Sequence, residues 1–406
     1  MSYVIERLGH RGEGVAPGVF VARALPGEVV EGAVENGRIA QPSILTPSSD
    51  RVAAPCRHYK ACGGCALQHA SNEFVTAWKE QIVVQALAGQ GLSAPFRPLH
   101  TSPANARRRA TLSGRRLKSG ALVGFHARAS DTLTAVPGCL LLHPALLATL
   151  PALEEVTLAG ASRKAELSLT VTALDGGVDL AVTGGKPLDT ALRMALPQIA
   201  AQHGLARLTW AGEALYQAQP PQLTFGRARV TPPPGAFLQA TPDGEAVLVA
   251  AMRDAVGGAR RIGDLFAGCG TFALPLAEHA EVHAVEGEGA MLAALDAGWR
   301  TSTGLKRLTT ETRDLFRRPL LPDELAQFEA LVIDPPRAGA EAQIAEIARA
   351  QVPVIGSVSC NPVTFARDAK TLSEAGYRLD WVQVVDQFRW SAHVELAARL
   401  SLNHIG

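Results

Sequence analysis

The C-terminal part of the chain, from about Ala236, alternates short apolar segments with longer segments that carry apolar residues at helical spacing. This alternation predicts an α/β fold, a Rossmann-like domain with a doubly wound, largely parallel sheet covered by helices on both faces. In such sheets ligands bind beyond the carboxyl ends of the strands, so residues at strand ends are the first site candidates. The expected strands are 261–266, 282–286, 331–334, 354–359, 381–385 and 394–400, with helices such as 241–256 and 338–350 between them.

The chain has 406 residues, more than one hydrophobic core usually serves, and three domains are expected. Residues 1–50 contain short alternating apolar runs separated by Pro-Gly and Asn-Gly turns, which predicts a small β-barrel such as an oligonucleotide-binding fold. Residues 51–235 begin with a cysteine-rich segment and a helix over 73–88, and continue with short strands and helices. They predict a central α+β domain, followed by the α/β domain over 236–406.

Positive charge is concentrated in one part of the chain, although the formal net charge is only +1. No Asp or Glu occurs between Glu80 and Asp131. Clustered guanidinium groups can displace counterions from a nucleic-acid backbone, so this block predicts a phosphate-binding surface. A solvated basic face without a partner is the alternative. The basic residues of the block are Arg97, Arg107, Arg108, Arg109, Arg115, Arg116, Lys118 and Arg128.

Nothing in the sequence indicates a membrane protein. No apolar run is long enough to span a bilayer. The first residues lack the basic-then-apolar layout of a secretory signal. We therefore expect a cytoplasmic protein with no membrane partner.

A glycine turn follows the first strand of the predicted sheet, in Asp264-Leu265-Phe266-Ala267-Gly268-Cys269-Gly270. Glycines allow the backbone to approach a ligand closely. Glu286 closes the next strand, where a carboxylate accepts hydrogen bonds from ribose hydroxyls. The third glycine of the dinucleotide fingerprint and the Walker lysine are both missing, which favours a nucleoside without a pyrophosphate, such as S-adenosylmethionine. Asp314, after a further expected strand, is a candidate adenine contact.

Two further strands end in reactive groups. Asp334-Pro335-Pro336-Arg337 ends one strand, and Cys360 ends the next in Ser359-Cys360-Asn361-Pro362. Cys360 is a candidate nucleophile, although a free cysteine is more often a buried core residue. Glu395 opens the final expected strand, and desolvation among apolar neighbours would raise its basicity, so it is the candidate base. His393 is the competing base or an orienting residue.

The other cysteines predict a metal centre. Cys56, Cys62 and Cys65 lie within ten residues of each other, and Cys139 lies farther along the chain. Four thiolates can hold zinc or an iron–sulfur cluster. Three clustered thiols plus a remote one favour [4Fe-4S], whereas His58 and His69 are additional ligands in a zinc alternative.

With these motifs, the chain resembles the RNA uracil-5-methyltransferases, the family that contains 23S ribosomal and transfer RNA enzymes. The resemblance extends over nearly the whole chain. It implies a TRAM-like RNA-binding module over 1–50, an iron–sulfur and RNA-binding domain over 51–235 and an S-adenosylmethionine-dependent methyltransferase domain over 236–406. The matching segments are 12–16, 25–28, Cys56-x5-Cys62-Gly63-Gly64-Cys65, Gly124-Phe125-His126, Phe237-Leu238-Gln239, 264–272, Asp334-Pro335-Pro336-Arg337, Ser359-Cys360-Asn361-Pro362 and 386–395.

The resemblance also implies residue roles. Cys360 would add to carbon 6 of uracil, which activates carbon 5 toward the methyl group, and Glu395 would then remove the carbon-5 proton. Phe237 would stack on the base. The resemblance adds Gln239, Phe266, Glu286 and Asp334 to Gly268 and Asp314 as the expected donor-site residues. The uridine contacts that it implies are Phe237, Gln239 and Asp334.

The TRAM-like module and the cysteines together resemble the ribosomal branch, so 23S rRNA is the expected substrate and a monomer the expected state. A transfer RNA uridine is one alternative, and a non-catalytic cluster-bearing RNA-binding protein is another. Three residues depart from the family pattern: Thr271 stands for Asn, Arg389 for Pro and Ser391 for Thr.

Overall fold

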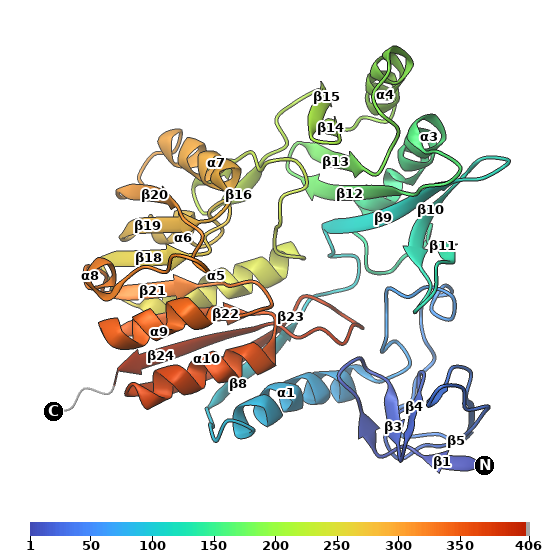
Figure 1. Ribbon diagram of the computed structural model, residues 1–406, viewed down its shortest axis with the longest axis horizontal. Coiled ribbons are helices and arrows are strands. Elements are labelled where there is room, and N and C mark those ends of the chain that lie inside the picture. The colour runs from blue at the N-terminus through green and yellow to red at the C-terminus, as the bar shows by residue number, and fades with distance from the viewer. Residues whose placement is uncertain (403–406) are drawn as a thin grey trace.

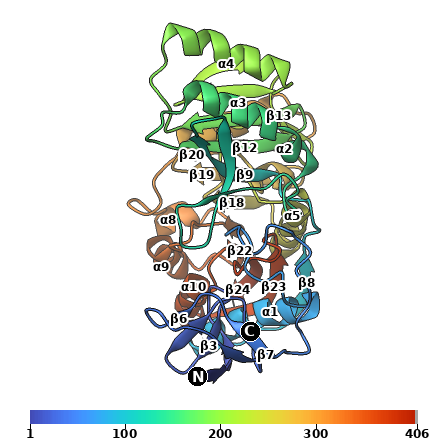
Figure 2. The same cartoon turned by 90° about the vertical axis from the view of Figure 1, so that its right-hand side faces the viewer.

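A computed structural model describes residues 1–402, and the last four residues of the predicted C-terminal domain lie outside this range. The N-terminal strands and the helices near residues 150 and 195 lie at opposite ends of the molecule, with the C-terminal sheet between them (Figures 1 and 2). Within residues 1–402, no helix is both long and apolar enough to cross a membrane.

The predicted α/β sheet is confirmed. Its strands are β18 (Arg261–Leu265), β19 (Glu281–Glu286), β20 (Leu308–Thr312), β21 (Ala330–Ile333), β22 (Val354–Ser359), β23 (Tyr377–Asp386), β24 (Leu396–Leu402) and β8 (Phe96–Thr101). They lie in the order β20-β19-β18-β21-β22-β24-β23-β8. The first five are parallel, and β24 is antiparallel to both of its neighbours. The final strand begins at Leu396, so Glu395 lies just before it, not at its start as predicted.

Helices cover both faces of this sheet. They are α1 (Asn72–Ala88), α5 (Pro242–Val256), α6 (Ala273–Leu276), α7 (Gly289–Arg300), α8 (Pro322–Leu325), α9 (Glu341–Ala350) and α10 (Pro362–Glu374). The core on one face contains Met252 of α5 and Leu295 of α7, whereas the other contains Ile347 of α9 and Phe365 of α10. Successive strand residues point to opposite faces, so one strand serves both cores.

Three segments predicted in the central domain fold with the C-terminal sheet instead. Strand β8 pairs in parallel with β23, and α1 packs against α10 (Figure 1). The hairpin of β16 (Leu223–Phe225) and β17 (Ala228–Val230) contributes to the core beneath α5 and α7. The predicted boundary at residue 235 therefore does not separate the cores, because the apolar faces of these segments are buried against the C-terminal sheet.

The rest of the central region forms a seven-stranded sheet in the order β11-β10-β9-β12-β13-β14-β15. Its core includes Leu153, Leu196 and Trp210 from helices and strands. The strands are β9 (Arg109–Arg116), β10 (Ala121–His126), β11 (Leu133–Ala135), β12 (Leu167–Leu174), β13 (Gly177–Thr183), β14 (Arg207–Trp210) and β15 (Glu213–Gln217). The helices are α2 (Pro144–Ala148), α3 (Leu150–Gly160) and α4 (Thr190–Gln202).

The N-terminal strands form two small sheets around one apolar core that contains Ile5, Val21, Val30 and Ile39. Strand pairing thus gives an all-β unit as predicted, but it does not show the closed barrel. One sheet joins β1 (Ser2–Val4), β5 (Val29–Glu31) and β7 (Ser43–Thr46). The other joins β2 (Arg7–Leu8), β3 (Gly14–Ala16), β4 (Val19–Val21) and β6 (Arg38–Ile39).

Candidate active site

A cleft of about 1280 Å³ lies where the three parts of the chain meet. Its wall includes Arg11 from the N-terminal part, Arg109 of β9 and Trp78 of α1. Cys360 and His393 line it from the C-terminal sheet. The cleft therefore brings the predicted nucleophile into contact with the part of the chain that carries the basic block.

Cys360 lies in the short connection between β22 and α10. The Asn361 side chain caps α10 by accepting a hydrogen bond from Val363 N over 3.1 Å, and its Nδ2 donates to the carbonyl of Arg337 over 2.9 Å. These contacts connect the loop that carries Cys360 to the loop formed by residues 334–337. Burial raises the pKa of the Cys360 thiol, and the nearby carboxylates of Glu395 and Asp334 raise it further.

Glu395 is buried, with 4% of its surface exposed. Burial is the main cause that raises its pKa to about 8, and the charge of Asp334 adds to the effect. The pKa of Asp334 is itself raised to about 7 by burial, against a hydrogen bond from Gln239 that lowers it. Two carboxyl groups whose pKa values lie near neutral pH, beside a thiol, are suited to proton transfer at physiological pH.

A chain of amides joins the two carboxyl groups. The Gln387 Oε1 atom accepts a hydrogen bond from Thr241 N over 3.2 Å, which fixes the orientation of this amide. Its Nε2 then donates both to Glu395 Oε2 and, over 2.8 Å, to Gln239 Oε1. Gln239 Nε2 in turn donates to Asp334 Oδ2 over 3.2 Å. Each carboxyl group therefore receives an N–H donor whose direction is set by the backbone at Thr241.

Sequence reasoning did not find Gln387. Its side chain is buried beside the start of α5, and a Cβ at Gly244 would lie only 2.3 Å from Gln387 Cγ. Gly244 therefore leaves the space that this amide occupies. The available signal was its position inside the matched segment 386–395.

Glu286 holds the glycine turn after β18. Its carboxylate accepts hydrogen bonds from Gly268 N and Glu288 N, both over 3.0 Å. Gly268 and Gly270 have φ values of +56° and +99°, which glycine adopts without strain. Phe266, also at positive φ, lies beside Phe316 with ring centroids 5.4 Å apart. Phe316 is largely exposed, and the sequence analysis did not identify it as part of this edge.

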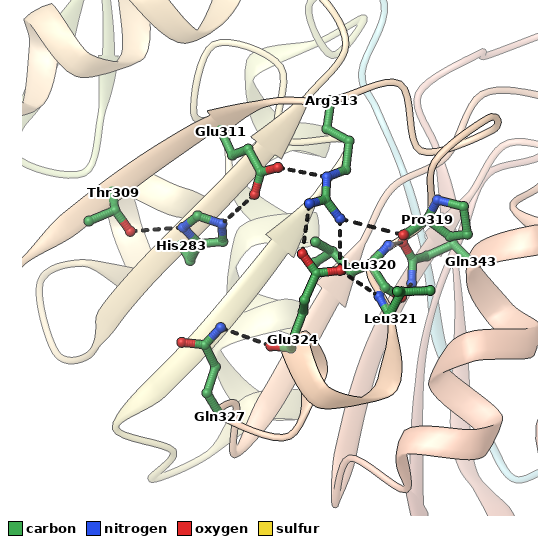
Figure 3. Close-up of polar contacts among 10 residues, drawn as sticks. All are labelled: His283, Thr309, Glu311, Arg313, Pro319, Leu320, Leu321, Glu324, Gln327 and Gln343. Atoms are coloured by element: carbon green, nitrogen blue, oxygen red, sulfur yellow. Dashed lines mark hydrogen bonds and ion pairs between the residues drawn. The ribbon is translucent and has the colours of Figure 1, made fainter.

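Asp314 follows β20, as predicted, but its Oδ1 accepts hydrogen bonds from Phe316 N and Arg317 N over 3.0 and 3.3 Å. It shapes the loop that carries Phe316, and its adenine contact stays a prediction. Figure 3 shows the hydrogen bonds that hold Arg313, the residue before Asp314. Arg313 donates to Glu311, to Glu324 and to the carbonyl of Pro319, and Glu324 accepts from Leu321 N.

A buried carboxyl group, that of Asp264, lies at the end of β18 just before the glycine turn. Both carboxylate oxygens of Asp264 are buried and have no hydrogen-bond partner among residues 1–402. Burial, followed by the charges of Asp334 and Glu286, raises the pKa of Asp264 well above its usual range. A positively charged ligand at the glycine turn would compensate this buried carboxyl group. The residues present thus fit S-adenosylmethionine, whose sulfonium and ammonium groups are cations.

The remaining predicted residues are placed as follows. Phe237 is 66% exposed, and Gln239, two residues later, is buried. His393 lines the cleft, and burial lowers its pKa, with further lowering by nearby cationic side chains. Ser391 Oγ accepts a hydrogen bond from His393 N over 3.2 Å, so the serine that stands for the family's threonine still closes this turn.

The four predicted metal ligands are near one another but do not form a ligating group. Cys139 and Cys62 pack in one core region, and the charges of Cys56, Cys62 and Cys139 all raise the pKa of Cys65, after burial. However, no three Cys, His, Asp or Glu side chains among the described residues converge as a metal site. The donor types fit an iron–sulfur cluster, and their present arrangement does not show one.

The segment that follows Cys65 contacts the loop that precedes Glu395. The backbone N–H groups of Ala66 and Leu67 donate to the carbonyl of Trp390 over 2.7 and 3.0 Å. Trp390 has a φ of +59°. These bonds place the residues after Cys65 directly against the loop between β23 and β24.

Known proteins share this architecture. Residues 244–402 match the family described as tRNA (Uracil-5-)-methyltransferase. An uncharacterised RNA methyltransferase of Brucella suis biovar 1 is 42% identical over 98% of this chain and 97% of its own length. A 23S rRNA (uracil(1939)-C(5))-methyltransferase of Halomonas elongata is 36% identical over 99% of this chain and 89% of its own. The crystal structure of Pyrococcus abyssi tRNA (uracil-54, C5)-methyltransferase with S-adenosyl-L-homocysteine has the same fold, with a TM-score of 0.77, 22% identity and coverage of 98% and 99%.

Proposed function

Because the chain belongs to the RNA uracil-5-methyltransferase family, we propose that it methylates carbon 5 of a uridine with Cys360 as nucleophile and Glu395 as base. One observation carries this assignment. The buried Glu395 carboxyl is close enough to Cys360 to raise the pKa of its thiol, and Cys360 lines a cleft of about 1280 Å³. S-adenosylmethionine is the methyl donor of the family.

The proposed reaction conserves atoms and charge. The Cys360 thiolate forms a bond to carbon 6 of uracil, and the electrons of the 5,6 double bond move toward oxygen 4 as an enolate. Carbon 5 then attacks the electrophilic methyl group of the donor, the bond between that methyl group and sulfur breaks, and S-adenosyl-L-homocysteine is the leaving group. Glu395 takes the carbon-5 proton, the double bond re-forms and the thiolate leaves. The base is required because the thiolate cannot leave before the proton does.

The amide chain supports these steps. Gln387 fixes Glu395 and Gln239, and Gln239 fixes Asp334, so the base and the donor side of the site share one hydrogen-bonded support. We further propose that Phe237, which is 66% exposed and two residues before Gln239, stacks on the base, as the family resemblance implies. Such preorganisation reduces the cost of aligning the reacting groups.

We propose 23S rRNA as the substrate. The ribosomal enzyme of Halomonas elongata matches the chain over nearly its full length at 36% identity, whereas the transfer RNA enzyme supports the fold alone. Unmodified 23S, 16S and transfer RNA would be incubated separately with labelled donor. Label in 5-methyluridine from 23S rRNA is expected, and exclusive labelling of transfer RNA would contradict the ribosomal assignment.

The N-terminal and central parts are proposed to bind this RNA. Arg7 and Arg11 of the N-terminal part and Arg107 and Arg109 of the central part line the same cleft as Cys360. Deleting residues 1–50 is expected to weaken RNA binding while donor binding is retained. We further propose a monomer, which light scattering of the purified protein tests directly.

We also propose that Cys56, Cys62, Cys65 and Cys139 bind a [4Fe-4S] cluster with a structural role. Support comes from the proximity of Cys56, Cys62 and Cys139 to Cys65, whose pKa all three raise. Anaerobically purified protein should contain about four iron and four sulfide per chain. Cys139→Ser should lose both, whereas Cys269→Ser, at a buried thiol outside this group, should retain them. Stoichiometric zinc would favour the alternative.

A further inference from the structure

The cleft is lined by arginines without matching carboxylates. No Asp or Glu of the described chain lines it. Only Arg128 among its arginines lies within 4 Å of a carboxylate, at 3.9 Å from Glu13, as far as residues 1–402 show. Uncompensated guanidinium groups at a partly buried surface favour a polyanionic ligand. The arginines are Arg7, Arg11, Arg107, Arg109, Arg128, Arg337 and Arg389.

Arg389 is held in place without neutralising its charge. It donates to the Ser102 carbonyl over 3.3 Å and to Asn72 Oδ1 over 3.1 Å. Its guanidinium group also lies 4.9 Å from the centroid of the Trp390 ring. The Nε atom is buried and has no partner within the described residues. All of these contacts are to neutral groups, so the cation is oriented but unpaired.

Arg107 lines the same cleft and lies near the ring of the residue before Arg389. Its Nε donates to the Arg109 carbonyl over 3.1 Å, and its guanidinium carbon is 5.6 Å from the centroid of Phe388, the residue before Arg389. A negative charge placed between Arg107 and Arg389 would offset the cost of burying both cations.

We propose that Arg389 and Arg107 form a binding site for one backbone phosphate of the RNA, close to the nucleotide that enters the Cys360 pocket. This inference rests on the proposed RNA methyltransferase activity. Arginine binds phosphate through paired N–H groups, and both side chains line the cleft that contains Cys360. Single-stranded RNA fits better than a duplex, because Trp78, Phe125 and Phe388 interleave with the arginines and can stack unpaired bases.

The position of Arg389 also matters for the reaction. Arg389 belongs to the segment between β23 and β24 that leads to Glu395. A phosphate bound there would hold the RNA and the base-bearing loop together.

The test measures binding of the shortest RNA that wild type methylates, in the presence of S-adenosyl-L-homocysteine and over a range of salt concentrations. Arg389→Gln should weaken binding about tenfold, as expected for one charge-assisted hydrogen bond. The slope of log Kd against log salt should fall by about 0.7, the value for one phosphate of a single strand. Arg163→Gln removes an equal charge at an exposed site outside the cleft and should change neither.

A second arm replaces single phosphates near the target uridine with neutral methylphosphonates. One replacement should weaken wild-type binding and have no further effect on Arg389→Gln. Additive losses at every position, or a salt slope equal to that of Arg163→Gln, would overturn the inference while leaving the proposed function intact. Failure of wild type to bind or methylate any RNA would instead overturn the proposed function. Retained binding of S-adenosyl-L-homocysteine shows that each variant is folded.

Discussion

The backbone N–H of Ala66 donates a hydrogen bond to the carbonyl oxygen of Trp390 over 2.7 Å. This bond connects the segment just after Cys65 to the loop that leads to Glu395. The cysteine-rich segment can therefore influence catalysis without taking part in it. Any ligand that fixes the four thiols would also fix one side of the base-bearing loop.

Loss of a cluster cysteine should loosen that loop. Cys65→Ser is expected to increase hydrogen exchange in residues 388–393, because the segment that holds Trp390 loses its anchor. Peptides from α4, at the end of the molecule opposite the N-terminal strands, serve as the internal control and should not change. Unchanged exchange in 388–393, with the metal lost, would show that the cysteines do not support the loop.

Removing the Gln387 amide should shift the pH dependence of the reaction. Gln387→Met deletes the donor to Glu395, and the loss of a hydrogen bond to a charged group raises the pKa of Glu395 by about one unit. A higher pKa leaves less ionised base at pH 7, so kcat/KM should fall and its rising limb should move to higher pH. Gln383→Met, at a glutamine of β23 that donates only to the Pro98 carbonyl, should leave the limb in place.

Donor binding should release protons near neutral pH. The pKa of Asp334 is raised to about 7 and that of Glu395 to about 8, and a bound sulfonium cation would lower both. Calorimetry in two buffers of different ionisation enthalpy measures this release. More protons should be released by S-adenosylmethionine than by S-adenosyl-L-homocysteine, which lacks the sulfonium charge, between pH 6 and about 8.5. Equal numbers of protons released by the two ligands would show that the sulfonium group does not affect these carboxyl groups.

The ion pair of Lys79 and Asp386 should contribute strongly to stability. Both side chains are almost fully buried, and Nζ and Oδ1 are 2.6 Å apart. Lys79→Met leaves an unpaired buried carboxylate, so the free energy of unfolding should fall by about 3–5 kcal/mol. Lys370→Met, which removes an exposed pair with Glu374 on α10, should cost less than about 0.5 kcal/mol. Denaturant titration compares the two variants, and equal losses would contradict the packing of α1 on the sheet.

Local patterns in the sequence identified much of the sheet and its reactive edge. Strand β22 ends at Ser359 as expected, and Asp334 directly follows β21, because β-branched runs and proline turns specify these boundaries locally. Long-range pairing was not predictable in this way. Nothing in residues 96–101 alone indicates that β8 joins β23 almost 300 residues later.

The same distinction applies within the site. Cys360 and Glu395 were predicted because each lies in a recognisable motif. Gln387 donates to Gln239, which is distant in sequence. Asp264 is notable because its buried oxygens have no hydrogen-bond partner in the described chain. Only the folded structure reveals either feature. Phe316 was missed because an exposed aromatic in a loop carries no periodic signal.

The central claim is that Cys360 forms a covalent bond to the RNA and that Glu395 allows its release. Wild type, Cys360→Ala and Glu395→Gln would be mixed with unmodified 23S rRNA and S-adenosylmethionine and run on a denaturing gel. A methylated adduct should accumulate with Glu395→Gln and be absent with Cys360→Ala. Methyl transfer by Cys360→Ala at the wild-type rate, with no adduct in any variant, would contradict the mechanism.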